Sequence, residues 1–118
     1  MTRPIRLLLS SPLSFGPGKA ELLERIGQTG SLQAAAASMD MSYMKAWKMI
    51  KGLNTAFTEP LVTMQRGGKE QGGAELTDNG RSVLALYHKA LAAAEKAVSP
   101  VLHEMSALLA PHDPDSGR

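Results

Sequence analysis

The side chains with the plainest binding chemistry in this sequence are basic, and they gather in its middle. Between Ser42 and Glu70 five basic residues stand against two acidic ones, a local excess of three positive charges, whereas the whole chain of 118 residues carries only +2. Clustered lysine and arginine side chains attract phosphate whatever the base sequence. We therefore predict contact with a nucleic acid, and the candidate residues are Ser42, Tyr43, Lys45, Lys48, Arg66 and Lys69.

Residues suited to catalysis or metal binding show no such grouping. The histidines are far apart in sequence and lack a paired acid at ligand spacing: His88, His103 and His112. The chain has no cysteine, which excludes disulfides and thiolate metal sites. The methionines between Met39 and Met49 could suggest a soft-metal cluster, but methionines at helical spacing usually fill a core. The sequence thus predicts no catalytic residue, no metal, no cofactor and no enzyme activity.

Two helices joined by a tight turn are predicted to carry the lysines. Ser31 can cap the first helix by accepting hydrogen bonds from its free N–H groups, and the run Ala34–Ala37 makes this helix narrow and strongly helical. Ser42 can cap the second helix in the same way. Apolar residues recur in the second helix at steps of 4, 3 and 4 and so share one face: Ala46, Ile50, Leu53 and Phe57.

The opposite face of the second helix carries Met44, Lys48, Lys51 and Thr55, with Lys45 on its flank. Tyr43 and Trp47 are expected to pack against the core rather than stack on bases, although Tyr43 could reach a phosphate. The pattern matches a helix-turn-helix, which lays its second helix in the DNA major groove. The alternative is a solvated lysine face with no ligand.

A basic hairpin is predicted directly after these helices. Leu61–Gln65 has the composition of a strand, Ala74–Leu76 forms a second short strand, and four glycines lie within seven residues between them. The loop also carries Arg66 and Lys69. A glycine-rich backbone can approach a phosphate closely, so this hairpin is interpreted as the wing of a winged helix. A surface hairpin without a ligand is the alternative.

Seven short motifs in this order resemble those of a known family: Gly30-Ser-Leu-x-x-Ala-Ala, Met41-Ser-Tyr-x-x-Ala-Trp47, Leu53-Asn54, Pro60-Leu-Val62, Gly67-Gly-Lys69, Gly72-Gly-Ala74 and Leu76-Thr-x-x-Gly80. The chain resembles the DNA-binding domain of the ModE-type molybdate-responsive transcription regulators, a relative of the LysR-type winged helix-turn-helix. The resemblance covers roughly residues 17–90. It implies a dimeric domain that binds DNA through the second helix and the wing.

The sequence departs from the family pattern on two elements. Met44 stands where family members often have lysine or arginine, and Glu70 and Gln71 interrupt the glycine run of the wing. Both changes lie on elements expected to face DNA, so the operator sequence is not carried over. Nothing in the chain resembles the oxyanion-binding domains of the full-length members. Molybdate is therefore not expected to bind this chain.

A long helix is predicted from a cap at Thr77 to about Ala110. Its apolar residues recur at alternating steps of 3 and 4, the heptad pattern that pairs helices along a stripe: Leu84, Tyr87, Leu91, Ala94, Val98, Val101, Met105 and Leu108. We expect homodimerisation through Leu84, Leu91, Val98, Met105 and Leu108. The alternative is that this stripe packs on the chain's own domain. Pro100 is expected to kink the helix or to start a new one.

The predicted fold is mainly α with a small β-hairpin: a winged helix-turn-helix over residues 1–76, a helical dimerisation arm over 77–110 and a disordered tail over 111–118. Ile5–Leu9 is expected to form a first strand, residues 10–18 a loop, and Lys19–Thr29 the first helix. No apolar run reaches the roughly 18 residues of a membrane span, and a cytoplasmic location is expected.

The function predicted from these elements is that of a dimeric, sequence-specific regulator that binds double-stranded DNA and is linked to molybdenum metabolism. Two alternatives stay open at this stage. One is an interaction protein of the same fold that does not bind DNA, which the replacements at Met44, Glu70 and Gln71 would allow. The other is a small-oxyanion sensor that uses the glycine-rich wing.

Overall fold

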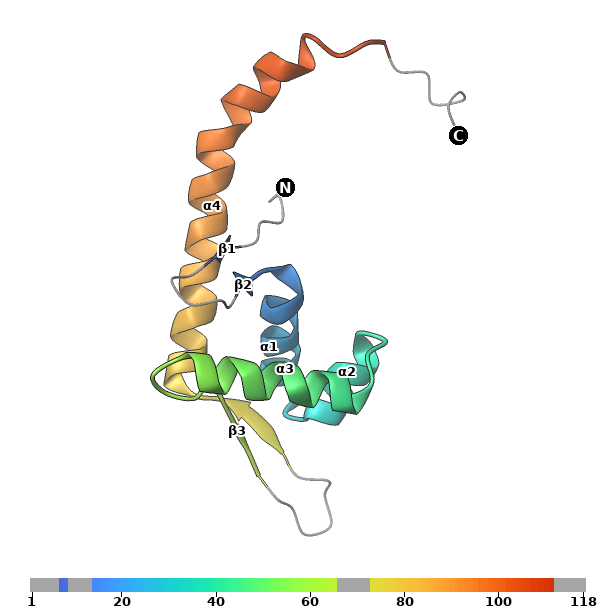
Figure 1. The fold of residues 1–118 in the computed structure, drawn as a ribbon, viewed down its shortest axis with the longest axis vertical. Helices are drawn as coiled ribbons and strands as arrows, with labels where there is room; N and C mark the ends of the chain where they lie inside the picture. The colour runs from blue at the N-terminus through green and yellow to red at the C-terminus, as the bar shows by residue number, and fades with distance from the viewer. Residues whose placement is uncertain (1–6, 9–13, 66–72, 112–118) are drawn as a thin grey trace.

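The structure is a computed structural model and describes residues 7–8, 14–65 and 73–111. The elements are, in chain order, β1 (Leu7–Leu8), β2 (Ser14–Phe15), α1 (Pro17–Thr29), α2 (Leu32–Ser38), α3 (Tyr43–Ala56), β3 (Val62–Met64), β4 (Ala74–Leu76) and α4 (Asp78–Ser106). The described part is thus mainly helical, with two separate antiparallel hairpins, β1–β2 and β3–β4. Figure 1 shows α4 running along the long axis of the molecule, with α1, α2 and α3 beside its first half.

The region before α1 differs from the expected loop. Ser14 and Phe15 form β2 and pair with β1, and α1 begins at Pro17, earlier than the predicted Lys19. Proline suits the first helical position because its backbone angle is already helical and its missing N–H is not needed there. At the other end Gly30 has φ 71° and donates its N–H to the carbonyl of Ile26 at 2.8 Å, a left-handed cap that favours glycine.

The predicted helix-turn-helix is confirmed, together with both of its serine caps. Ser31 Oγ accepts from the Ala34 N–H at 3.0 Å, and Ser42 Oγ accepts from the Lys45 N–H at 3.1 Å. Between the helices Asp40 takes a left-handed conformation with φ 54°, which lets the chain reverse within three residues.

The predicted hairpin is present as β3 and β4, paired in the register Val62–Leu76, Thr63–Glu75 and Met64–Ala74. The pairing continues one step further, where Gln65 donates its N–H to the Gly73 carbonyl at 2.7 Å. The tip of the predicted wing, with Arg66 and Lys69, lies outside the described residues. Figure 1 shows β3 and β4 projecting from the body at the end opposite the last turns of α4.

The long helix α4 begins at the predicted cap, where Thr77 Oγ1 accepts from the Gly80 N–H at 2.9 Å. It ends at Ser106, before the expected end near Ala110. Pro100 does not start a new helix: α4 continues through it, because a proline removes only one helical hydrogen bond and keeps helical backbone angles. The last turns lean away from the line of the earlier ones in Figure 1, as expected for a proline bend.

The core forms around α1, whose buried residues are Ala20, Leu22, Leu23 and Ile26. Leu32 from α2, Leu53 from α3 and Leu61 before β3 close over it. Phe15 and Tyr87 meet edge to face with ring centroids 5.1 Å apart, which attaches β2 to α4. No helix among the described residues is long and apolar enough to cross a membrane.

The apolar stripe of α4 divides into two parts. Tyr87 is buried, and Leu84 and Leu91 pack in part against the core of their own chain. This part of the stripe therefore follows the alternative, in which it packs on its own domain. Val98, Val101 and Met105 are exposed, and Leu108 lies beyond the end of α4 with 86% of its surface exposed.

Candidate nucleic-acid interface

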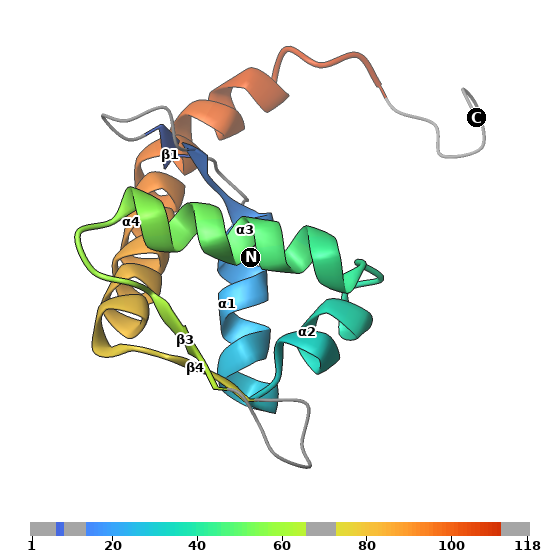
Figure 2. The same cartoon turned by 60° about the horizontal axis from the view of Figure 1, so that its bottom comes forward.

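The outer face of α3 carries the predicted basic side chains. Lys45, Lys48 and Lys51 are exposed on it, while Ala46, Ile50 and Leu53 fix the opposite face in the core. Figure 2 shows α3 lying across α1 on the near side of the molecule, with the β3–β4 hairpin beside it. A rigid helix thus presents its lysines to solvent next to a projecting hairpin.

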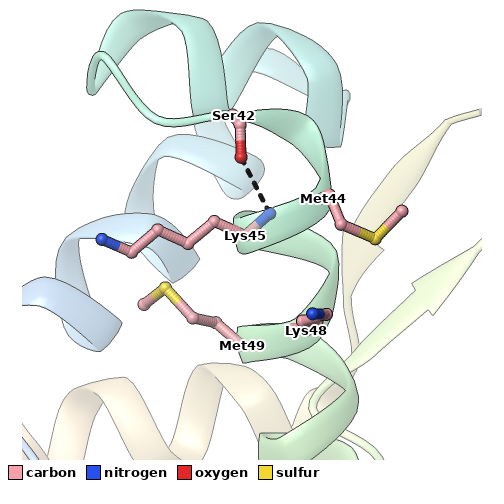
Figure 3. Close-up of a pocket in the computed structure, with 5 residues that line it drawn as sticks. All are labelled: Ser42, Met44, Lys45, Lys48 and Met49. Carbon is pink, nitrogen blue, oxygen red and sulfur yellow. Dashed lines mark hydrogen bonds between the residues drawn. The ribbon is translucent and has the colours of Figure 1, made fainter.

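A shallow hollow of about 450 Å³ lies on this face and is lined by Ser42, Met44, Lys45, Lys48 and Met49. In Figure 3 the side chains of Lys45 and Met49 extend to one side of α3, and Met44 extends to the other. The Ser42 hydroxyl oxygen is held by the Lys45 N–H at the start of the helix. The lining therefore combines two ammonium groups with two thioethers, so it offers both charge and apolar surface.

The expectation that Tyr43 and Trp47 pack in the core is wrong. Tyr43 is 48% exposed and Trp47 38% exposed, because both lie on the flank of α3 rather than on its buried face. The ammonium group of Lys51 stands 5.0 Å from the centroid of the Trp47 ring, a cation–π contact between residues one turn apart. The spacing of four residues was the available signal for this pair, which the sequence analysis did not single out.

Asn54 connects α3 to the hairpin, and sequence reasoning had given it no role. Its Oδ1 accepts from the N–H groups of Leu61 at 2.8 Å and Val62 at 3.2 Å, and its Nδ2 donates to the Val62 carbonyl at 3.0 Å. One side chain from the last turn of α3 thus forms hydrogen bonds with three backbone groups at the start of β3. This contact links the hairpin directly to the helix that carries the lysine face.

The start of α4 is hydrogen-bonded to the same segment, just before β3. Thr77 donates its N–H to the Leu61 carbonyl at 2.9 Å and its hydroxyl to the Pro60 carbonyl at 2.7 Å. A Cβ on Gly80 would lie 2.2 Å from the Leu61 carbonyl oxygen, so only glycine permits this approach. The motif Leu76-Thr-x-x-Gly80 is therefore explained as the joint between the hairpin and α4.

Four of the six predicted DNA-contact residues lie on one helix of the described part of the chain. Ser42, Tyr43, Lys45 and Lys48 lie along the first two turns of α3, whereas Arg66 and Lys69 lie outside the described residues. The predicted dimerisation residues are spread along α4: Leu84 and Leu91 are partly covered by their own domain, and Val98, Met105 and Leu108 are exposed.

A capped helix-turn-helix followed by a hairpin, with lysines on the outer face of its second helix, defines the winged helix-turn-helix class of DNA-binding domain. Comparison with known families agrees: residues 18–81 match the lysR family of bacterial regulatory helix-turn-helix proteins. The chain belongs to this family, whose members are DNA-binding regulators and not enzymes. The match spans α1 to the first turn of α4 and so includes every element that positions the lysine face.

Similar curated proteins carry names that refer to molybdenum or to transcription. The molybdenum-pterin-binding protein MopB of Rhodobacter capsulatus is 41% identical over 73 residues, covering 62% of this chain and 27% of that protein. The molybdenum transport protein ModE of Azotobacter vinelandii is 42% identical over 69 residues, or 58% of this chain and 26% of ModE. The transcriptional regulator ModE of Yersinia pestis is 39% identical over 83 residues, which cover 70% of this chain and 32% of that protein.

The chain thus spans between a quarter and a third of the length of these relatives. The resemblance to ModE-type regulators inferred from the motifs is confirmed for this part of the chain.

Proposed function

We propose that the protein is a sequence-specific transcription regulator that places α3 in the major groove of double-stranded DNA and the loop of the β3–β4 hairpin on the phosphate backbone. The observation that carries the proposal is the exposed lysine face of α3, held at a fixed orientation to the hairpin by Asn54. In helix-turn-helix domains the N-terminal residues of the second helix contact base edges, while flanking basic groups contact phosphates.

The residues divide between these two tasks. Tyr43 and Ser42 lie at the start of α3, where backbone and side chains meet bases or the nearest phosphate. Lys45 and Lys48 follow on the exposed face and supply phosphate contacts. Arg66 and Lys69 are proposed to do the same from the hairpin loop. Lys51, which stands over the Trp47 ring, is proposed as a further phosphate contact on the exposed side of α3.

Homodimerisation through α4 is part of the proposal. Exposed apolar residues on the last turns, Val98, Val101 and Met105, offer a surface for a second copy of the chain. At ~1.5 Å per residue α4 is long enough, at ~43 Å, to separate two domains by the ~34 Å of one DNA turn. The proposed organisation is a DNA-binding domain over residues 1–76, an arm over 77–110 and a tail over 111–118.

The regulated genes are proposed to concern molybdenum metabolism. This step rests on the names of the similar proteins, which refer to molybdenum transport and molybdenum-pterin binding. The similarity covers only 27% and 32% of those relatives, so their binding of molybdenum compounds is not carried over to this chain. A regulator of chromosomal genes would work in the cytoplasm, which is the proposed location.

Lys48→Ala should test the phosphate contacts. Selection from a random duplex library should enrich a preferred duplex, and wild-type affinity for it should fall steeply with salt. Lys48→Ala should weaken binding similarly on preferred and unrelated duplexes and reduce the slope of log K against log salt by about one. Lys96→Ala, which removes the same charge from an exposed position on α4, is the matched control.

Two results would contradict the proposal. Failure to enrich any duplex would remove sequence-specific binding altogether and leave an interaction protein of the same fold. Equal effects of Lys48→Ala and Lys96→Ala on the salt slope would place α3 away from the DNA.

A further inference from the structure

We propose that Met44 is a specificity-determining residue that selects thymine by apolar contact with its C5-methyl group in the major groove. The inference rests on the proposed function and adds the base that one position of α3 reads. Met44 has no role in the phosphate contacts proposed above.

The place of Met44 in α3 is the first observation. It is the second residue of the helix, directly after Tyr43, and it is 56% exposed. Side chains at the N-terminal end of a recognition helix are the ones that reach base edges. Isolated exposed apolar residues are common on protein surfaces. Met44 differs from such residues because it lines the same hollow as the two proposed phosphate contacts, Lys45 and Lys48.

The chemistry of the side chain is the second observation. A thioether has no N–H or O–H to donate and accepts hydrogen bonds only weakly, so it cannot read the donor and acceptor pattern of a base. The thymine methyl is the apolar feature that distinguishes base pairs in the major groove. Lysine or arginine at this position would instead suit the O6 and N7 acceptors of guanine. Methionine therefore shifts the preference of this position from guanine toward thymine.

The surroundings of Met44 support the same conclusion. Lys45 and Lys48 line the hollow together with Met44, whereas Figure 3 shows Met49 extending to the opposite side of α3. Phosphate attraction by the lysines would hold this end of α3 in the groove, where the Met44 thioether meets the base edges. The unbranched methionine side chain has three rotatable bonds and adapts to the methyl it meets.

The experiment replaces the thymines of the selected duplex, one at a time, by deoxyuridine, which removes only the methyl group. For wild type at least one replacement should weaken binding by about four-fold, the ratio that corresponds to one buried methyl. Met44→Ala should bind the thymine and uracil duplexes equally. Met44→Leu, which keeps an apolar side chain of similar size, should retain the difference.

Lys48→Ala separates this inference from the proposed function. It should weaken binding to both duplexes and leave the thymine-to-uracil ratio unchanged. Thermal unfolding of Met44→Ala should match wild type because the side chain is exposed.

A wild type that binds every uracil-substituted duplex as tightly as the original would overturn the inference, as would a Met44→Ala variant that keeps the four-fold ratio. In both cases the proposed function would stand. If selection enriches no duplex at all, the proposed function fails, and the role of Met44 fails with it.

Discussion

At the scale of single residues, the start of α3 serves structure and binding together. Ser42 Oγ is occupied by the Lys45 N–H, so its first task is to cap the helix that presents Lys45 and Lys48. The sequence predicted this cap because serine directly before an amphipathic run is a strong local signal. It did not predict the exposure of Trp47, because apolar periodicity separates the buried from the exposed face but leaves residues on the flank undecided.

Ser42→Ala and Ser31→Ala form a matched pair, since each removes one hydroxyl that caps one helix of the same motif. Each should lower the free energy of unfolding by roughly 0.5–2 kcal/mol in chemical denaturation. At a temperature where both variants are fully folded, only Ser42→Ala should weaken DNA binding, because Ser31 begins α2 and not the helix proposed to enter the groove. Equal loss of affinity in both variants would reduce Ser42 to a structural residue.

At the scale of elements, the sequence predicted what is local and missed what joins distant segments. The caps of α2, α3 and α4 and the two strands of the hairpin follow from signals within a few residues. The attachment of β3 to α3 by Asn54, and to α4 by Thr77, joins residues separated along the chain by turns that no periodicity describes. The pairing of β2 with β1 was missed for the same reason.

Asn54→Ala should loosen the hairpin from α3. Removing the side chain leaves the partly buried N–H groups of Leu61 and Val62 without this acceptor, at a cost of about 1–3 kcal/mol in the free energy of unfolding. Affinity for the selected duplex should fall even where the variant is folded, because the hairpin loses its fixed orientation to the lysines. Calorimetric unfolding and a mobility shift, measured together, check both effects.

Two further variants sharpen the test of Asn54. Asn54→Asp keeps an acceptor for both N–H groups but sets a negatively charged oxygen against the Val62 carbonyl, so it should be destabilised as well and should not rescue DNA affinity. Ser106→Ala removes an exposed hydroxyl that bonds within α4, away from the lysine face, and should change little. A stable Asn54→Ala variant with undiminished DNA affinity would show that the hairpin needs no such attachment.

At the scale of the whole molecule, the division of the α4 stripe decides how a dimer can form. Tyr87, Leu84 and Leu91 are committed, fully or in part, to the core of their own chain. A charge introduced at Leu91 would therefore disturb folding as well as association. The heptad pattern could not reveal this division. The spacing of apolar residues is the same in the turns that pack on the domain as in the turns that extend beyond it. The exposed turns beyond Val98 are where a second copy can be tested separately.

Val101→Asp should convert the dimer to a monomer without unfolding the domain. Val101 is 55% exposed in the single chain, so a carboxylate there is tolerated by the monomer but would be buried between two paired arms. Sedimentation equilibrium at micromolar concentration should give a dimer for wild type and a monomer for Val101→Asp, with the same unfolding temperature of the core.

His103→Asp adds the same side chain two residues further along α4, away from the apolar stripe and also at an exposed position, and should remain dimeric. Affinity for a palindromic duplex should fall for Val101→Asp and not for His103→Asp, because one domain alone contacts only one half-site. Each Val or Leu buried between the arms contributes about 1.5–3 kcal/mol, so a single charge in the stripe is enough to offset several such contacts. A wild-type chain that sediments as a monomer, or a Val101→Asp variant that stays dimeric, would place the dimer contact elsewhere than on the distal turns of α4.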